Sequence, residues 1–65
     1  MDKQEFMKRF SERTNQDHVI LRVKTSKVNI YADVYRFSKD DKYVIFTVDG
    51  EAIAKIKLSE ISLVE

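Results

Sequence analysis

Cysteine, proline and tryptophan are absent from this sequence of 65 residues, and glycine occurs once. Without cysteine the chain forms no disulfide, no thiolate zinc site and no thiol nucleophile. No stretch approaches the roughly 20 apolar residues that span a bilayer. Charge of neither sign dominates, because 12 Lys and Arg stand against 11 Asp and Glu. This balance excludes a strongly basic nucleic-acid arm or an acidic tail as the main feature.

The composition is typical of a folded soluble domain, since 43% of the residues are hydrophobic and 35% are charged. A chain this short buries only about 60% of the surface that its unfolded form exposes, so we expect a single domain over residues 1–65. Residues 2–5 (DKQE) are polar and unlike a secretory signal. We therefore expect a cytoplasmic protein with no membrane partner.

The first segment has the periodicity of an amphipathic helix over about residues 2–13. Asp2 and Glu5 have the spacing of a capping box at its start. The polar run TNQD at residues 14–17 contains poor helix formers and should end the helix. Its apolar residues share one side: Phe6, Met7 and Phe10.

The rest of the chain is rich in Val, Ile, Tyr and Phe, which favour strands. We expect strands at about 18–24, 28–37, 43–48, 51–58 and 61–64, with a single tight turn at Leu58-Ser59-Glu60. The predicted fold class is α+β. An N-terminal helix precedes an antiparallel meander of 4–5 strands, either a small SH3-like or Sm-like barrel or a strongly curled sheet.

Three short turns set the expected register. Asp49-Gly50 is the strongest hairpin signal, a type I′ turn that needs positive φ at both positions. Asp40-Asp41 and Thr25-Ser26 are expected at the centres of the other two. Together the turns predict the pairs Val48–Glu51, Phe46–Ile53, Phe37–Val44, Tyr35–Phe46, Asp33–Val48 and Leu21–Ile30.

Alternation along the strands then divides their residues between two faces. One face is nearly all apolar and is the expected core: Val19, Leu21, Val23, Val28, Ile30, Ala32, Val34, Tyr43, Ile45, Ala52, Ala54, Ile56 and Leu58. Its only polar interruptions are Arg36 and Thr47. The other face has an aromatic and aliphatic centre with charged margins. A helix of about 12 residues cannot cover both. Either it caps the apolar face and the mixed face meets solvent or a partner, or it covers the mixed face and the apolar face curls on itself or dimerises.

The order of helix, short strands and tight turn is similar to that of small SH3-like and Sm-like barrels. The segments QEFMKRF (4–10) and LSEISLV (58–64) resemble the ends of the bacterial Sm-like RNA chaperones. That family bends its second strand at a glycine and carries a Lys-His pair before its last turn. Here residues 28–37 contain no glycine and the corresponding place reads Lys57-Leu58-Ser59. The family's RNA-binding residues therefore have no counterpart in this chain.

Few residues carry catalytic chemistry. His18 faces Asp33 in the expected register and could form a hydrogen-bonded pair, but no nucleophile or ligand cluster accompanies it. The acidic residues of Asp40-Asp41 and Asp49-Gly50-Glu51 fit turns better than metal sites. We expect no enzymatic activity, cofactor, metal or small-molecule substrate.

The mixed face is the candidate partner surface, with aromatic and aliphatic residues at its centre and cations at its rim: Tyr31, Tyr35, Phe37, Phe46, Ile53, Arg22, Lys24, Lys55 and Lys57. Such a patch favours a protein partner or a second copy of the chain. The same aromatics and cations could instead bind single-stranded RNA or DNA. A third alternative is that the helix buries this face and function lies in loops. The small size suits an adaptor or inhibitor of a larger complex, of the kind that phages and mobile elements carry.

Overall fold

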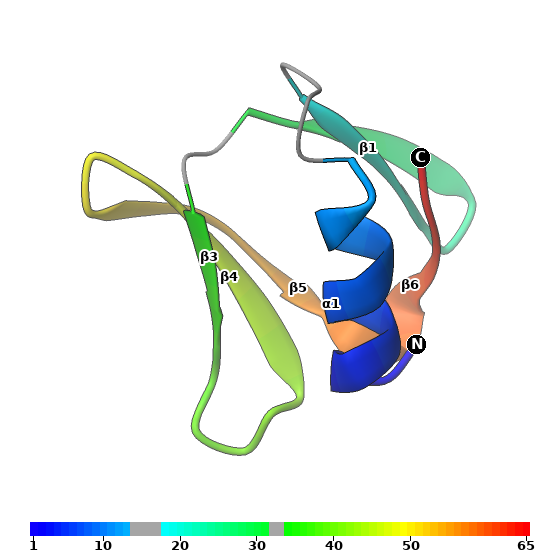
Figure 1. The fold of residues 1–65 in the computed structure, drawn as a ribbon, viewed down its shortest axis with the longest axis horizontal. Coiled ribbons are helices and arrows are strands. Elements are labelled where there is room, and N and C mark those ends of the chain that lie inside the picture. Colours follow the sequence, from blue (N-terminus) through cyan, green and yellow to red (C-terminus); the bar gives the residue numbers. More distant parts are fainter. Residues whose placement is uncertain (14–17, 32–33) are drawn as a thin grey trace.

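The computed structural model describes residues 1–13, 18–31 and 34–65 (Figure 1). Its elements in chain order are α1 (Lys3–Ser11), β1 (Val19–Val23), β2 (Ser26–Ile30), β3 (Val34–Phe37), β4 (Tyr43–Val48), β5 (Glu51–Lys57), the 3-10 helix η1 (Leu58–Glu60) and β6 (Ile61–Val64). The strand bounds expected at 43–48 and 61–64 are confirmed. The tight turn expected before the last strand is η1.

The start of α1 is fixed by the expected cap. The Asp2 Oδ1 atom accepts a hydrogen bond of 2.8 Å from the backbone N–H of Glu5, which satisfies one of the N–H groups that a helix start leaves unpaired. The Glu5 carboxylate does not return a bond to the Asp2 backbone, as a full capping box requires. It accepts a hydrogen bond of 3.2 Å from Arg9 Nε instead. The helix ends at Ser11, two residues before the expected end, with Glu12 as its C-cap.

The strands form two antiparallel sheets of three strands each, ordered β2-β1-β6 and β3-β4-β5. The α+β class is therefore confirmed. Among the described residues no strand pairing joins the two sheets, so they do not close into a barrel. The described residues form six strands instead of the expected four or five, because the segment expected as one strand over 28–37 includes the end of β2 and all of β3, which belong to different sheets.

In two of the three expected hairpins, the strand pairs next to the turn are the expected ones. Asp49 and Gly50 have φ values of 52° and 83°, as a type I′ turn requires, and Val48 pairs with Glu51. The β3–β4 pairs Tyr35–Phe46 and Phe37–Val44 also match. The expected Asp33–Val48 pair falls outside the described residues.

The first hairpin turns one residue earlier than expected. Val23 pairs with Ser26, so the turn consists of Lys24 and Thr25, and Leu21 lies opposite Val28 rather than Ile30. The partner of each β1 residue therefore shifts by two positions along β2. A two-residue change preserves the side to which each residue points, so the expected inward residues of β1 and β2 remain inward.

The β4–β5 ladder contains a bulge that the sequence pattern did not predict. Thr47 pairs with Ala52 and Phe46 pairs with Ala54, which leaves Ile53 as an extra residue without a cross-strand partner. The expected Phe46–Ile53 pair is therefore wrong. Beyond the bulge Lys55 lies opposite Ile45, so Lys55 points to the same side of the sheet as Ile45. The expected register had placed Lys55 on the side of Phe46.

The expected division into two faces is consequently reversed in β3 and β4. The inward residues there are Tyr35, Phe37, Val44 and Phe46, whereas Val34, Tyr43 and Ile45 point outward with Ala52 of β5. The alternation of inward and outward positions departs from the expected pattern twice. Ile30 points inward but Val34 points outward, and the bulge at Ile53 restores the expected pattern. The two changes cancel, because the inward positions of β5, Ala54 and Ile56, were expected correctly.

The helix lies across the opening between the two sheets (Figure 1). Phe6 is fully buried, in one cluster with residues from both sheets, including Leu21, Phe46 and Ile61. Neither expected position of the helix is found, since it covers the inner sides of both sheets at once. The side of β3-β4-β5 that remains outside carries Tyr43, whereas the other aromatic residues of this sheet, Tyr35, Phe37 and Phe46, point inward.

Candidate functional site

The structure separates the nine residues expected to form one partner surface. Three of them are the aromatic residues Tyr35, Phe37 and Phe46, which point into the protein from β3 and β4. Three others remain exposed along β5: Ile53, Lys55 and Lys57. The last three belong to the other sheet and the segment after it: Arg22, Lys24 and Tyr31.

The three inward aromatics surround Phe6 of the helix. The Phe6 ring centroid lies 5.3 Å from that of Tyr35, 6.0 Å from Phe37 and 6.1 Å from Phe46. These pairs are edge-on, which is the favourable approach for aromatic quadrupoles. Phe46 is fully buried, and the other two are half-buried. They therefore hold α1 against the sheet and offer little surface to a partner.

The residues near the first sheet are held by local contacts. The Lys24 ammonium is 2.8 Å from the Glu60 carboxylate, and this hydrogen bond and charge raise the pKa of Lys24 above its ordinary value. Tyr31 is 59% exposed and stacks on His18 with ring centroids 4.9 Å apart. The expected contact of His18 with Asp33 falls outside the described residues.

The outward side of β3-β4-β5 is an exposed surface on which three expected site residues come together: Ile53, Lys55 and Lys57. The ladder aligns its residues in rows across the three strands. The rows are Val34–Thr47–Ala52, Arg36–Ile45–Lys55 and Tyr43–Lys57. We call this surface, together with Ile53 at the bulge, the outer face.

One end of the outer face is apolar. Val34 is 63% exposed and Ile53 is 51% exposed, on either side of the central strand. Thr47 lies between them and is buried, with its hydroxyl donating to the Val34 carbonyl at 3.3 Å. Large apolar side chains with this exposure, gathered on one face, are typical of contact surfaces.

The other end of the outer face is cationic. Arg36, Lys55 and Lys57 point outward, and no outward position of the face is acidic. None of the three forms an ion pair with a carboxylate in the part of the chain that the structure describes. The Lys55 ammonium lies 4.7 Å from the centroid of the Tyr43 ring, a cation–π contact that holds this lysine over the face.

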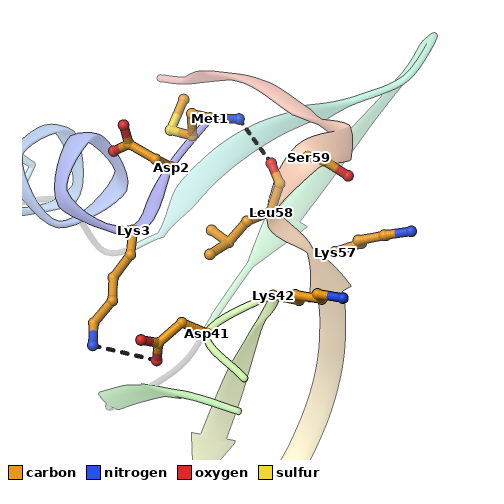
Figure 2. Close-up of a pocket in the computed structure, with 8 residues that line it drawn as sticks. All are labelled: Met1, Asp2, Lys3, Asp41, Lys42, Lys57, Leu58 and Ser59. Carbon is orange, nitrogen blue, oxygen red and sulfur yellow. Dashed lines mark hydrogen bonds and ion pairs between the residues drawn. The ribbon is translucent and has the colours of Figure 1, made fainter. Parts of the chain in front are cut away.

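A groove of about 520 Å³ adjoins the cationic end, where the start of α1 meets the end of β5 (Figure 2). Lys3 turns toward Asp41 and forms an ion pair of 3.3 Å. Lys42 and Lys57 extend away from that pair (Figure 2). The Met1 amine donates to the carbonyls of Leu58 at 2.8 Å and Ile61 at 2.9 Å, which closes the upper wall of the groove.

The acidic turns serve local structure. The Asp40 carboxylate accepts from the Ser38 hydroxyl at 2.6 Å and from the Lys42 N–H at 3.1 Å, and these bonds lower the pKa of Asp40. In residues 1–13, 18–31 and 34–65, no three His, Cys, Asp or Glu side chains gather as a metal site would need. The described helices also include none with the length and apolarity to cross a membrane.

Five residues of the outer face come from β3 and β4 and were expected on the inward side instead: Val34, Arg36, Tyr43, Ile45 and Thr47. The signal that pointed the other way was the polar character of Thr47 and Arg36 in an otherwise apolar expected core. A buried arginine without a partner is costly, so its presence already favoured the opposite orientation for β3.

No model of a known protein family matches the chain, and no curated protein or solved structure matches it either.

Proposed function

We propose that this chain is a small non-catalytic interaction module that binds a protein partner, or a second copy of itself, through the outer face. The observation that carries the proposal is the juxtaposition of exposed Val34 and Ile53 with three cations that form no ion pair with a carboxylate of the described residues. An apolar centre beside charged residues is the usual anatomy of a protein interface. An adaptor or inhibitor in a larger cytoplasmic complex fits this role.

The interior supports the choice of this surface. The aromatic residues of β3 and β4 are used to bind α1, so docking on their side would require displacing the helix from Phe46 and Tyr35. The outer face needs no such rearrangement. A partner that covers it gains the burial of Val34 and Ile53, at about 25 cal/mol for each Å² of apolar surface removed from water.

Single-stranded RNA or DNA is the second candidate ligand. It is favoured by one observation: Arg36, Lys55 and Lys57 lie on the face that also carries Tyr43, with no acidic residue at its outward positions, and the Lys55 ammonium lies 4.7 Å from the Tyr43 ring centroid. Cations that contact phosphate and an aromatic ring that stacks on a base are the usual combination for single strands. The order of elements is also similar to that of the SH3-like class, and we propose a relation to that class in an open form, since no strand pairing among the described residues joins the two sheets.

The test is partner capture from lysate of the source cell, with the immobilised chain and three variants. Val34→Asp and Ile53→Asp place a charge in the apolar end of the outer face, at positions already exposed to water. Met7→Asp is the matched control, because Met7 is 37% exposed but lies on α1. We expect the two face variants to lose a partner, or to lose self-association in sedimentation, that the control retains.

Circular dichroism must show the same spectrum for all three variants. Capture that is equal for Ile53→Asp and Met7→Asp would contradict the proposal. For the second candidate, a labelled mixed-sequence oligonucleotide should bind at low salt and weaken steeply toward physiological salt. Absence of binding at low salt removes nucleic acid from consideration.

A further inference from the structure

The edge of β5 is open to a further strand. In the described part of the chain β5 pairs only with β4, on one side, and it is the longest strand with 7 residues. An edge strand presents unpaired N–H and C=O groups in alternation. Among the described elements only β4 packs extensively against β5, which lies at the end of its sheet. Five of its residues are exposed: Glu51, Ala52, Ile53, Lys55 and Lys57.

The side chains along this edge favour an added strand that carries negative charge. Lys55 and Lys57 lie two residues apart, both pointing to the outer face, and neither has a carboxylate partner among the described residues. Arg36 lies in the same row as Lys55. Opposite charges that face each other on neighbouring strands stabilise their pairing, and like charges destabilise it.

The same charges disfavour one occupant and the backbone disfavours another. Because Glu51 is the only acidic residue of β5, a second copy that paired its own β5 here could place a β5 carboxylate opposite at most one of the two lysines. Nucleic acid phosphates would contact the lysines, but a sugar–phosphate backbone does not present donors and acceptors in the alternating order and spacing of a strand edge. A peptide backbone supplies both donors and acceptors at the spacing of the edge.

We propose that the outer edge of β5 binds an extended acidic segment of a partner protein, which adds a fourth strand to β3-β4-β5 with carboxylates at alternate positions opposite Lys55 and Lys57. This inference rests on the proposed function, since it names the chemistry of the partner. Residues between the carboxylates would be apolar, because they would pack beside Ala54 and Ile56, which are half-buried on the inner side.

The probe is a fluorescein-labelled peptide about as long as β5, with glutamate and valine in alternation. Three comparison probes are a lysine–valine peptide, the glutamate peptide with N-methyl groups on alternate amides, and an oligo-dT strand of similar charge. We expect binding of the glutamate peptide that weakens at least about tenfold between low and high salt. N-methylation of the peptide amides that face β5 should also weaken binding at least about tenfold, because it removes the hydrogen bonds between the peptide and β5.

The variant for this test is the double substitution Lys55→Glu/Lys57→Glu. We expect it to lose the glutamate peptide and to gain the lysine peptide. Lys8→Glu/Lys27→Glu is the matched control, with the same change in net charge at exposed positions of α1 and β2, and it should change binding less than about twofold, as screening of distant charges predicts. Amide exchange should slow along β5 when the glutamate peptide is bound.

Equal binding of the N-methylated and unmodified peptides would overturn strand addition, and tighter binding of oligo-dT than of the glutamate peptide would overturn the acidic segment. Failure of the glutamate peptide to bind also overturns this inference. That failure leaves the proposed function standing if Ile53→Asp still abolishes partner capture. If capture does not depend on the outer face at all, the proposed function itself is wrong.

Discussion

The two sides of the β3-β4-β5 sheet are made by the same three strands and have opposite character. The inner side carries Tyr35, Phe37 and Phe46 around Phe6 and binds the helix. The outer side carries cations and the exposed aliphatic residues Val34 and Ile53 around the buried central residues Ile45 and Thr47. The comparison teaches that aromatic residues in a small protein are more valuable as a core than as a contact surface, because so little other material is available to bury.

The largest effect should come from removing the residue on which the inner side depends. Phe6→Ala is expected to lower the free energy of unfolding by about 3–5 kcal/mol, because it empties the centre of the aromatic cluster. Urea unfolding followed by circular dichroism measures this. The matched substitution on the outer side, Val34→Ala, should cost less than about 0.5 kcal/mol. Equal costs for the two would mean that the sides do not differ in the way described.

An intermediate effect is expected at the turn that sets β5 against β4. Gly50 has a φ of +83° and nothing lies within 4 Å of the position of an added Cβ. Gly50→Ala should therefore lower stability by about 1–2 kcal/mol through backbone strain alone. Thermal unfolding of the synthetic chain with D-alanine at this position provides the control, since D-alanine favours positive φ. A loss of stability with D-alanine as large as with L-alanine would show that strain is not the cause.

The smallest effect concerns the turn between β3 and β4. The hydrogen bond from Ser38 holds the pKa of Asp40 below its ordinary value, so Ser38→Ala should raise the pKa of Asp40. Because a lowered pKa favours the ionised carboxyl in the folded state, its contribution to stability is present above the ordinary pKa and is lost as pH falls through the folded-state pKa. An NMR titration of the Asp40 carboxyl carbon measures the shift. An unchanged titration in the variant would contradict the role assigned to Ser38.

Local signals in the sequence were sufficient for much of the fold. Asp2 with Glu5 predicted the helix start, and Asp49-Gly50 predicted the turn and the Val48–Glu51 pair. Each of these depends on interactions within a few residues, so their chemistry is visible in the sequence itself. The class and the order of elements followed from them.

The orientation of β3 and β4 could not be predicted in the same way. Residues 28–37 contain no glycine or proline to mark where β2 gives way to β3, and β-favouring residues on both sides of the change gave an uninterrupted strand pattern. The bulge at Ile53 was equally hidden, since Ile53 and Ala54 are both apolar. Because the expected partner surface depended on that orientation, its aromatic part was placed on the wrong side of the sheet.

The bulge also determines how the chain tolerates changes in its length. Loss of Ile53 would leave Ala52 opposite Thr47 and Ala54 opposite Phe46, in an uninterrupted ladder. Both sides of the sheet would then keep their residues, which a one-residue deletion in a regular strand does not permit. A deletion in the central strand β4 has no such spare residue of its own. The edge strand that is open to a partner is thus also the strand in which natural or engineered variants can most easily lose a residue and keep the fold.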